Sequence, residues 1–292
     1  MKLQLTGKTA LVTGASSGIG RGLAKALAAE GVLLAVSARR AEPLASLADE
    51  IEKAGGARPV VLTADLSKRG QAANLAARAT VALGRVDILV NNAGVGIGGA
   101  QHVVGDDAMA RELFETNYWS ALALIAALVP AMRTRGVGAV VNVASIGAVT
   151  PMPLAGHYSS SKAALSLCSE TMRLELRGSG VNVFSVLPGP VDTGMLAEFG
   201  VVPGADKVLG KMPRGNVAEL SRKVVRGLER GQRALVYPTA LGFMRHLPTL
   251  ANRISASVID GLVDVDDARK LQGGSHGDPL ALAARSAFEA RG

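Results

Sequence analysis

The sequence predicts a single doubly wound α/β domain, in which a seven-stranded parallel sheet is covered by helices on both faces. Three observations lead to this prediction. Short β-type runs alternate with longer helical stretches, the runs are continuously apolar, and a glycine-rich turn follows the first of them. Strands of a parallel sheet are buried on both faces and therefore read as continuous apolar runs, and the connecting lengths suit crossover helices.

The seven predicted strands are spaced so that a helix fits between each pair. Each run is rich in Val, Leu, Ile or Ala, which favours a strand. The runs span residues 8–13, 32–37, 57–63, 86–91, 138–144, 181–187 and 233–238. Because no internal repeat or interdomain linker is found, we expect one domain over residues 1–240, followed by a C-terminal helical extension and mobile tail over residues 241–292.

The composition is typical of one large globular domain. The chain has 292 residues, of which 48% are hydrophobic and 19% charged. Its single cysteine, Cys168, excludes an intramolecular disulfide framework, and no Cys/His spacing indicates a metal site. The first residues lack the features of a signal peptide, and the apolar run 121–132 is shorter than a membrane span and contains Pro130. We therefore expect a soluble cytoplasmic protein.

The positive charge of the chain is concentrated in one late segment. The formal net charge is +8, and residues 211–253 contain nine Lys or Arg residues against two acidic residues. Nucleic-acid binding is not expected, because this segment has no recognition motif and only 3% of the chain is aromatic, which is poor for base stacking.

A glycine-rich turn, TGASSGIG at residues 13–20, follows the first predicted strand and opens a helix. Glycines at such a turn let the pyrophosphate of a dinucleotide approach the backbone amides at the positive end of the helix. Taken alone, the pattern also fits an ordinary tight turn between strand and helix. The candidate cofactor-binding residues here are Gly14, Ser16, Ser17, Gly18, Ile19 and Gly20.

The end of the second predicted strand, SARR, indicates which cofactor is preferred. Many NAD-binding chains place an acidic residue here, which accepts a hydrogen bond from the adenosine 2′-hydroxyl. This chain has Ala38 and Arg39 instead, with Arg40 as a second cation. The guanidinium of Arg39 can reach a 2′-phosphate, so we expect NADP(H) to be favoured over NAD(H). The alternative is that both arginines face solvent, as exposed arginines commonly do.

Tyr158 lies four positions before Lys162 in AGHYSSSKAAL, which places both on one face of a helix. An ammonium ~4 Å from a phenolate would lower the phenol pKa by roughly three units at an effective dielectric near ~20. The pair is therefore a candidate acid/base, although such a pair on its own is more often an ordinary helix face. The adjacent His157 points about 100° away and is not expected to act, and Cys168 is expected to be a buried small residue.

Together these motifs resemble the classical short-chain dehydrogenase/reductase family over roughly residues 5–240. The resemblance rests on TGxxxGxG at Thr13–Gly20, NNAG at Asn91–Gly94, Asn117 in ETNYW, Ser145 in NVASIG, YxxxK at Tyr158–Lys162 and PGPVDT at Pro188–Thr193. Ser145 precedes Tyr158 by thirteen residues, which matches the family pattern, and no catalytic position departs from it.

The resemblance implies a Rossmann-type fold and an NADP(H)-dependent oxidoreductase that transfers a hydride. Tyr158 would be the acid/base, and Lys162 would also hold the nicotinamide ribose. Ser145 would hydrogen-bond the reacting oxygen, and Asn117 would hold a water that links Lys162 to solvent. The alternative is a non-catalytic NADP(H)-binding regulatory or scaffold protein. The intact set of four residues favours the enzyme.

The resemblance also implies the remaining cofactor contacts. They are Asp65 and Leu66 beside the adenine ring, Asn92, Ala93 and Gly94 along the adenosine ribose, and Pro188, Gly189, Val191 and Thr193 at the nicotinamide. Asn91 is expected to be structural. Each set has a simpler alternative, because Asp65 could cap the next helix and a Pro/Gly-rich strand exit could be a plain turn.

The substrate is expected to be a hydrophobic ketone, aldehyde or secondary alcohol. Residues 194–213 mix apolar side chains with glycines, as a lid over such a substrate would, although an ordinary surface loop is the alternative. The candidate substrate-binding residues are Ser145, Met152, Leu154, Met195, Leu196 and Phe199. The sequence does not choose among individual compounds or fix the physiological direction.

Beyond Tyr237, apolar residues recur every three or four positions near Arg245, His246 and Arg253. They are Leu241, Met244, Leu247, Leu250, Ile254 and Val258, with Pro248 as an interruption. Such a stripe could pack against another subunit, cover the active site or lie on an anionic membrane surface. Packing is favoured, so we expect a homo-oligomer, a dimer or a tetramer, with weak peripheral membrane contact as the alternative.

Overall fold

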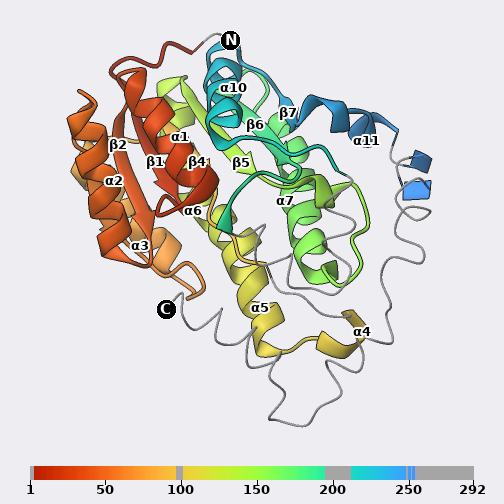
Figure 1. Cartoon of the computed structure of the whole chain (residues 1–292). Helices are drawn as coiled ribbons and strands as arrows, with labels where there is room; N and C mark the ends of the chain where they lie inside the picture. Colours follow the sequence, from red (N-terminus) through yellow and green to blue (C-terminus); the bar gives the residue numbers. More distant parts are fainter. Residues whose placement is uncertain (1–2, 97–100, 195–211, 248, 251, 254–292) are drawn as a thin grey trace.

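The computed structural model describes residues 3–96, 101–194, 212–247, 249–250 and 252–253. These residues form a three-layer α/β fold around one sheet of seven strands (Figure 1). The strand order is β3-β2-β1-β4-β5-β6-β7, and every neighbouring pair is parallel. The predicted fold class is confirmed.

The strands lie where the apolar runs predict them. They are β1 (Thr9–Thr13), β2 (Leu33–Ala38), β3 (Val60–Thr63), β4 (Ile88–Asn91), β5 (Gly138–Val143), β6 (Val181–Pro188) and β7 (Ala234–Tyr237). The α-helices are α1 (Gly18–Ala29), α2 (Ala41–Lys53), α3 (Gln71–Leu83), α4 (Gln101–Val104), α5 (Ala108–Phe114), α6 (Ser120–Arg135), α7 (Gly156–Glu175), α10 (Val217–Arg230) and α11 (Phe243–His246). Three short helices of other types are η1 (Glu115–Trp119), η2 (Ile146–Ala148) and η3 (Thr239–Leu241).

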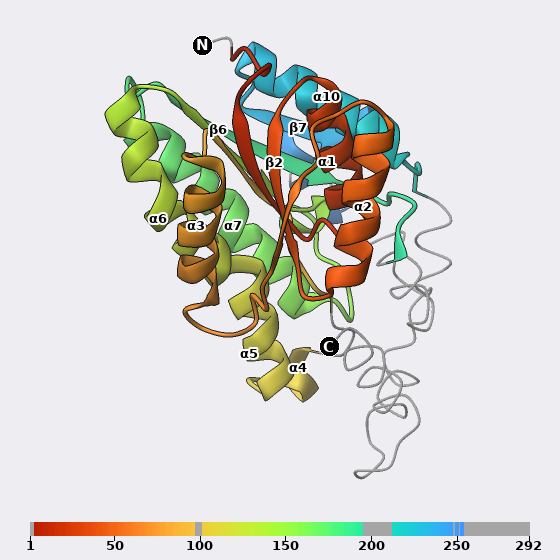
Figure 2. The ribbon, with the colours of Figure 1, turned by 90° about the vertical axis from the view of Figure 1, so that its left-hand side faces the viewer.

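The sheet separates two apolar cores (Figure 2). Helices α1, α2 and α10 cover one face, where Leu23, Leu44 and Leu220 pack on the strands. Helices α3, α6 and α7 cover the other face, where Leu75 and Leu124 are fully buried. The strands are buried on both sides, which explains why their sequences are apolar without alternation.

The direction of the chain across the sheet reverses between β1 and β4. Strands β1, β2 and β3 proceed outward on one side, and β4 to β7 proceed outward on the other. In open parallel sheets a crevice forms outside the carboxyl ends of the strands at this reversal, and ligands bind there. The loops that leave β1, β4, β5 and β6 therefore define the candidate site.

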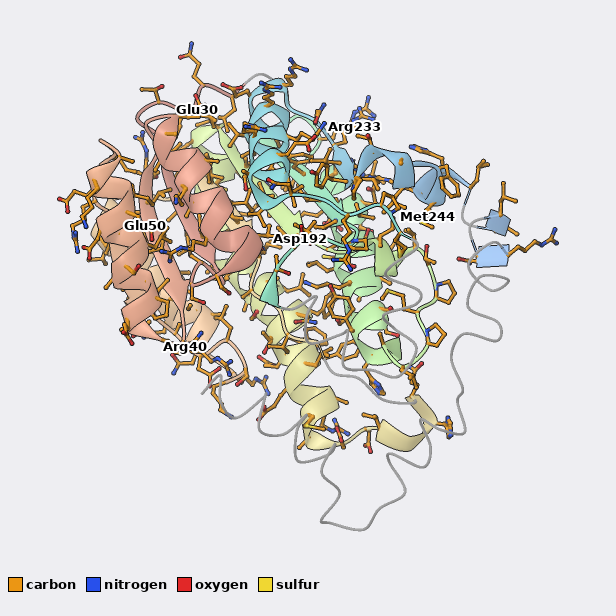
Figure 3. All side chains as sticks on the ribbon, viewed as in Figure 1. Glu30, Arg40, Glu50, Asp192, Arg233 and Met244 are labelled. Atoms are coloured by element: carbon orange, nitrogen blue, oxygen red, sulfur yellow. The ribbon has the colours of Figure 1, made fainter. Side chains whose placement is uncertain are left out.

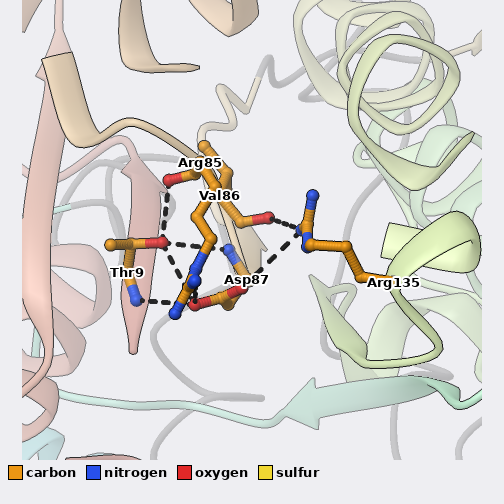
Figure 4. A network of polar contacts seen from close by, with 5 residues as sticks. All are labelled: Thr9, Arg85, Val86, Asp87 and Arg135. Atoms are coloured by element: carbon orange, nitrogen blue, oxygen red, sulfur yellow. Dashed lines mark hydrogen bonds and ion pairs between the residues drawn. The ribbon is translucent and has the colours of Figure 1, made fainter. Parts of the chain in front are cut away.

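At the opposite, amino-terminal edge of the sheet, a buried carboxylate ties β1 to β4 (Figure 4). Asp87 is 1% exposed, and its Oδ2 accepts hydrogen bonds from the Thr9 backbone N–H at 3.2 Å and from Arg85 Nε at 3.1 Å. Arg135 Nη2 lies 3.6 Å from Asp87 Oδ1 and donates to the Val86 carbonyl at 2.8 Å. The network fixes strand register and lies away from the site.

One helical stretch of the described residues, Ala108–Arg135, has the length and composition of a membrane span. Its mean hydropathy over the most apolar part is 1.2, and 44% of that part is buried. The sequence prediction considered only a shorter run within it. The evidence for a span is weak because core helices share these properties, and Leu124, Leu128 and Met132 of α6 pack in a core of this fold.

Candidate active site

The glycine-rich turn between β1 and α1 has no room for a side chain at Gly14 or Gly20. A Cβ atom at Gly20 would lie 2.2 Å from the Gly14 carbonyl oxygen, and one at Gly14 would lie 2.8 Å from Ala93 Cα. Gly14 and Gly18 also have positive φ values of 63° and 52°, which favour glycine. Ser17 caps α1 without a side-chain hydrogen bond to the helix amides. The backbone can therefore receive a pyrophosphate closely at the helix N-terminus, as a dinucleotide requires.

Thr13, at the end of β1, holds the NNAG segment against this turn. Its Oγ1 donates to the Val90 carbonyl at 3.1 Å and accepts from the backbone N–H groups of Asn92 at 3.0 Å and Ala93 at 3.1 Å. Asn92 Nδ2 donates to the carbonyls of Thr13 at 3.0 Å and Gly14 at 3.2 Å. Thr13 begins the glycine motif but is not among the predicted cofactor-binding residues.

Asn91 does not face this crevice. Its Nδ2 donates to Asn142 Oδ1 at 2.9 Å, and Asn142 Nδ2 donates to Ser169 Oγ at 2.8 Å, so a buried polar ladder joins β4, β5 and α7. This placement agrees with the structural role expected for Asn91.

Arg39 and Asp65 follow the carboxyl ends of β2 and β3, which are neighbours in the sheet. Arg39 is partly exposed, and the described residues offer it no ion pair. Asp65 Oδ1 accepts from Ser67 N at 3.0 Å and from Ser67 Oγ at 2.8 Å, which forms a local turn. Leu66 is buried at 6% exposure. The turn role of Asp65 leaves its second carboxylate oxygen available for a ligand.

The segment after β6 returns to the glycine turn. Gly189 N donates to the Tyr237 carbonyl at 2.7 Å, and Val191 forms a parallel bridge with Gly215. A Cβ at Gly18 would lie 3.1 Å from Thr193 Cγ2, so Thr193 lies against the first glycine turn. The predicted pyrophosphate and nicotinamide segments are thus brought together.

Tyr237, which is not among the predicted site residues, supports this segment. Its ring covers Gly215, where a Cβ would lie 2.3 Å from Tyr237 Cε1. Its hydroxyl donates to Glu219 Oε2 at 2.8 Å and accepts from Asn216 N at 3.0 Å. These contacts link β7 to the start of α10, and no short sequence motif marks them.

Ser145, Tyr158 and Lys162 converge at the carboxyl end of β5. Ser145 follows this strand, its Oγ accepts from Gly147 N at 3.1 Å, and a side-chain hydrogen bond joins it to Tyr158. Lys162, one helical turn after Tyr158 on α7, donates from Nζ to the Val143 carbonyl at 3.0 Å. Ser145 and Tyr158 are 8% exposed and Lys162 is 3% exposed, so the three polar groups are shielded from water.

Asn117 lies in the π-helix η1, and its side chain forms hydrogen bonds with backbone groups and with a serine hydroxyl. Its Oδ1 accepts from Val95 N at 2.8 Å, and its Nδ2 donates to the Val95 carbonyl at 2.9 Å and to Ser161 Oγ at 3.0 Å. A Cβ at Gly94 would lie 3.1 Å from Lys162 Nζ and 3.3 Å from Asn117 Oδ1. Asn117 therefore fixes the NNAG segment beside Lys162, while the implied water link stays a prediction.

Burial, and not the lysine, dominates the protonation of the pair. Desolvation raises the pKa of Tyr158 above its usual 10.0, and the hydrogen bond with Ser145 acts in the opposite direction. Desolvation also lowers the pKa of Lys162 from 10.5 to about 8. The expected lowering of the phenol pKa is therefore wrong for this structure. The reason is that burial disfavours both charged forms, and Lys162 Nζ lies 5.9 Å from the centre of the Tyr158 ring.

Met152, one of the predicted substrate-binding residues, lies beside Ser145. A Cβ at Gly147 would lie 2.9 Å from Met152 Sδ and 3.5 Å from Ser145 Oγ. Leu154 is buried at 9% exposure and has a φ of 62°, which is uncommon for a branched side chain and marks a sharp turn before α7. Three further candidates, Met195, Leu196 and Phe199, lie outside the described residues, as does nearly all of the predicted lid.

His157 contacts a loop backbone, and Cys168 is a partly buried free thiol. The Nε2 atom of His157 is 2.6 Å from the Gly105 carbonyl oxygen. Cys168 is partly buried, and burial, with the charge of Glu175, raises its pKa. Among the residues that the structure describes, no group of three His, Cys, Asp or Glu side chains could hold a metal ion.

Comparisons with known proteins agree with this geometry. The sequence profile of the short chain dehydrogenase family matches residues 8–201. The chain belongs to the short-chain dehydrogenase/reductase family. It is 41% identical over 191 residues to a short chain dehydrogenase of Pseudocercospora fijiensis, an alignment that covers 65% of this chain and 62% of the relative.

Two solved short-chain dehydrogenase structures resemble the whole fold. One, from Sphingobium yanoikuyae in complex with NADPH, is 30% identical with a TM-score of 0.71 and covers 82% of this chain and 94% of its own. The other, from Burkholderia phymatum in complex with NAD, is 25% identical with a TM-score of 0.74 and covers 86% and 97%. Members of this family are NAD(P)-dependent oxidoreductases that act on CH–OH groups, and this short-chain dehydrogenase is an enzyme of that class.

Proposed function

We propose that this short-chain dehydrogenase interconverts a hydrophobic ketone or aldehyde and the corresponding alcohol with NADP(H). The observation that carries the proposal is the hydrogen-bonded pair of Ser145 and Tyr158, buried beside Lys162 at the carboxyl edge of the sheet. The bound nicotinamide would supply or accept the hydride. The glycine turn without room for a side chain at Gly14 or Gly20 fits the pyrophosphate of such a cofactor.

Side chains of this protein transfer the proton to and from the substrate oxygen. Because burial keeps the pKa of Tyr158 above 10, its Oη carries a proton at neutral pH and can give it to a carbonyl oxygen during reduction. Ser145 can donate a hydrogen bond to the same oxygen as negative charge develops there. When Lys162 is charged, its ammonium stabilises the phenolate that Tyr158 becomes. In the oxidation direction the phenolate takes the alcohol proton.

A test compares wild-type protein and Tyr158→Phe with NADPH and a panel of hydrophobic carbonyl compounds. The substitution removes only the transferable proton, so turnover should fall by roughly 10²- to 10⁴-fold while the NADPH dissociation constant stays nearly unchanged. Near-native turnover by Tyr158→Phe, on a substrate whose chemical step limits the rate, would contradict the assignment. Cofactor binding with no turnover of any compound would favour the regulatory or scaffold alternative.

The preference for NADP(H) is proposed from Arg39. Arg39 directly follows Ala38, the last residue of β2, and its guanidinium has no ion-pair partner among the described residues. A charge-assisted hydrogen bond to a 2′-phosphate contributes about 1.5 to 3 kcal/mol, which is roughly tenfold to a hundredfold in affinity. Arg39→Ala should weaken NADPH binding by that factor and leave NADH binding unchanged. Equal affinities of the wild type for both cofactors would contradict the preference.

A homo-oligomer, a dimer or a tetramer, is also proposed. The large apolar side chains of Trp119, Leu167 and Leu174 are 53%, 70% and 73% exposed, and they lie on η1 and α7. Leu167 and Leu174 are seven residues apart and therefore lie on one face of α7, and exposed apolar patches commonly mark contacts between proteins. The solution molar mass of the full chain tests this, and a monomer would contradict it. We further propose a cytoplasmic location, since the only cysteine, Cys168, is a free thiol.

A further inference from the structure

The outward face of α10 carries a stripe of arginines. Leu220, Val224 and Leu228 are buried on the side that faces the sheet. Arg222, Arg226 and Arg230 recur every four residues on the other side and are exposed, and the exposed Arg233 follows the helix. Residues spaced by four lie on one helix face, so the cations form a continuous row.

Glu219, an acidic side chain near this row, hydrogen-bonds Tyr237 and pairs with Lys223, and the charge of Arg222 contributes only a smaller part to the lowering of its pKa. The ion pairs of this region involve Arg214 with Asp192, Lys223 with Glu219, and Arg245 with Glu170. Within the described parts of the chain, none of the recorded ion pairs includes Arg222, Arg226, Arg230 or Arg233. These four of the late cations are therefore exposed and have no ion pair among the described residues.

Large apolar side chains are exposed after β7. Phe243 is 39% exposed, Leu247 54% and Leu250 49%. They are held outward because the same segment is anchored on its inner side, where Leu241 and Met244 are buried against Ile146. The exposed residues thus form the outer face of a segment that is attached to the fold.

A cluster on α7 links Arg233, which follows the row of arginines, to the apolar segment. Glu170 pairs with Arg173 on α7 and, at 2.6 Å, with Arg245 on α11. Burial and then the charges of Arg245 and Arg233 lower the pKa of Arg173, which places both arginines close to it. Figure 1 shows β7 between α10 and α11, and Figure 3 shows Arg233 and Met244 on the same side of the molecule.

We propose that this surface docks on an anionic lipid bilayer, with the arginines on the headgroups and the apolar side chains inserted between them. We name it the basic–apolar edge, and its residues are Arg222, Arg226, Arg230, Arg233, Phe243, Leu247 and Leu250. Cations beside exposed apolar side chains match both layers of a bilayer surface. The proposal is independent of the oxidoreductase function.

Other partners fit the edge less well. In a two-fold symmetric dimer the same patch meets itself, which would bring arginine against arginine without an acidic partner. Nucleic acid would use the arginines but not Phe243, Leu247 and Leu250, because the phosphate backbone offers no apolar surface. A bilayer uses both kinds of side chain.

The test is sedimentation of the full chain with vesicles at low and high salt. Vesicles of phosphatidylcholine with phosphatidylglycerol are compared with vesicles of phosphatidylcholine alone. Each cation near an anionic surface strengthens binding roughly fivefold, so Arg222→Gln/Arg226→Gln should weaken it roughly thirtyfold. The matched control is Lys53→Gln/Arg133→Gln, which removes two exposed cations elsewhere and should change binding little.

A second pair of variants tests the apolar part. Leu247→Ser should weaken vesicle binding, whereas Val81→Ser, at a residue that is 85% exposed on α3, should not. High salt should release the wild type, because the cations are solvent-exposed. NADPH affinity, measured for every variant, should equal that of the wild type and confirms that each is folded.

Four results would overturn the proposal. The first two are that the wild type does not sediment with anionic vesicles at low salt, or that it sediments equally with neutral vesicles. The other two are that the arginine variant binds vesicles as strongly as its control, or that Leu247→Ser binds them as strongly as Val81→Ser. A protein that binds duplex DNA at the same phosphate concentration but not vesicles would identify a nucleic-acid surface instead.

Discussion

Replacement of Lys162 by methionine should remove turnover and yet relieve a stability cost. Lys162 is 3% exposed, and its pKa is lowered from 10.5 to about 8 by burial. At roughly 1.4 kcal/mol per pKa unit, the buried charge costs on the order of 3 kcal/mol at neutral pH. Lys162→Met removes this cost but leaves the Val143 carbonyl without its donor, which costs about 1 to 3 kcal/mol. The variant should therefore be as stable as the wild type at neutral pH, or more stable by up to about 2 kcal/mol.

The pH dependence of stability isolates the charge itself. Between about pH 8 and about pH 10.5 the unfolded chain keeps the proton on Lys162 while the folded protein has lost it. The unfolded state binds more protons there, so the free energy of unfolding rises with pH across this window. From about pH 8 to about pH 10 the contribution of Lys162 to this rise should be about 2 kcal/mol, and the raised pKa of Cys168 acts in the opposite direction in every variant. Above this window the raised pKa of Tyr158 acts in the opposite direction, so the measurement ends near pH 10.

Urea unfolding of the cofactor-free protein measures this rise for the wild type, Lys162→Met and the control Lys53→Met. Lys53 is exposed at the end of α2, so its replacement should leave the pH dependence unchanged. Lys162→Met should show a rise smaller by about 2 kcal/mol than the wild type. Equal rises in all three proteins would refute the assignment of a buried, weakly basic Lys162.

Two further substitutions test the scaffold of the site. Asp87→Asn should lower the free energy of unfolding by about 1 to 3 kcal/mol, because the Asp87 carboxylate is buried among charged donors. The control Asp49→Asn, at a carboxylate that is 53% exposed, should lower it by less than about 1 kcal/mol. Equal effects of the two substitutions in urea unfolding would contradict this expectation. Gly20→Ala should weaken NADPH binding, because the new Cβ would lie 2.2 Å from the Gly14 carbonyl oxygen. An unchanged NADPH dissociation constant would show that the turn adapts.

The sheet could be predicted from the sequence because its strands are buried on both faces. A predicted run at residues 181–187 became β6 over Val181–Pro188, and the run at residues 8–13 became β1 over Thr9–Thr13. The third strand is shorter than predicted, since β3 begins at Val60 and not at residue 57. Pro59 lacks the N–H that a ladder needs and Arg58 is exposed, so both precede the strand.

The convergence of Ser145, Tyr158 and Lys162 could also be predicted, because the motifs fall where parallel strands end at a common edge. The pKa shifts of Tyr158 and Lys162 could not be predicted. The shift of Tyr158 depends on how completely the fold shields the phenol, which the spacing of two residues does not encode. The hydrogen bond from Lys162 to the Val143 carbonyl could not be predicted either, because every residue has a carbonyl and only the fold determines which one lies beside Lys162.

The domain was expected to end at residue 240, but the residues just after this position pack against the site. Leu241 and Met244 pack against Ile146, which follows Ser145, and a Cβ at Gly189 would lie 2.4 Å from Leu241 Cδ1. Thr150 also donates to Met244 Sδ at 3.8 Å. A chain ended after Pro238 would therefore uncover the serine loop and the nicotinamide segment together. Loss of membrane binding by such a chain would coincide with loss of the site, so the test of the basic–apolar edge uses side-chain substitutions in the full protein.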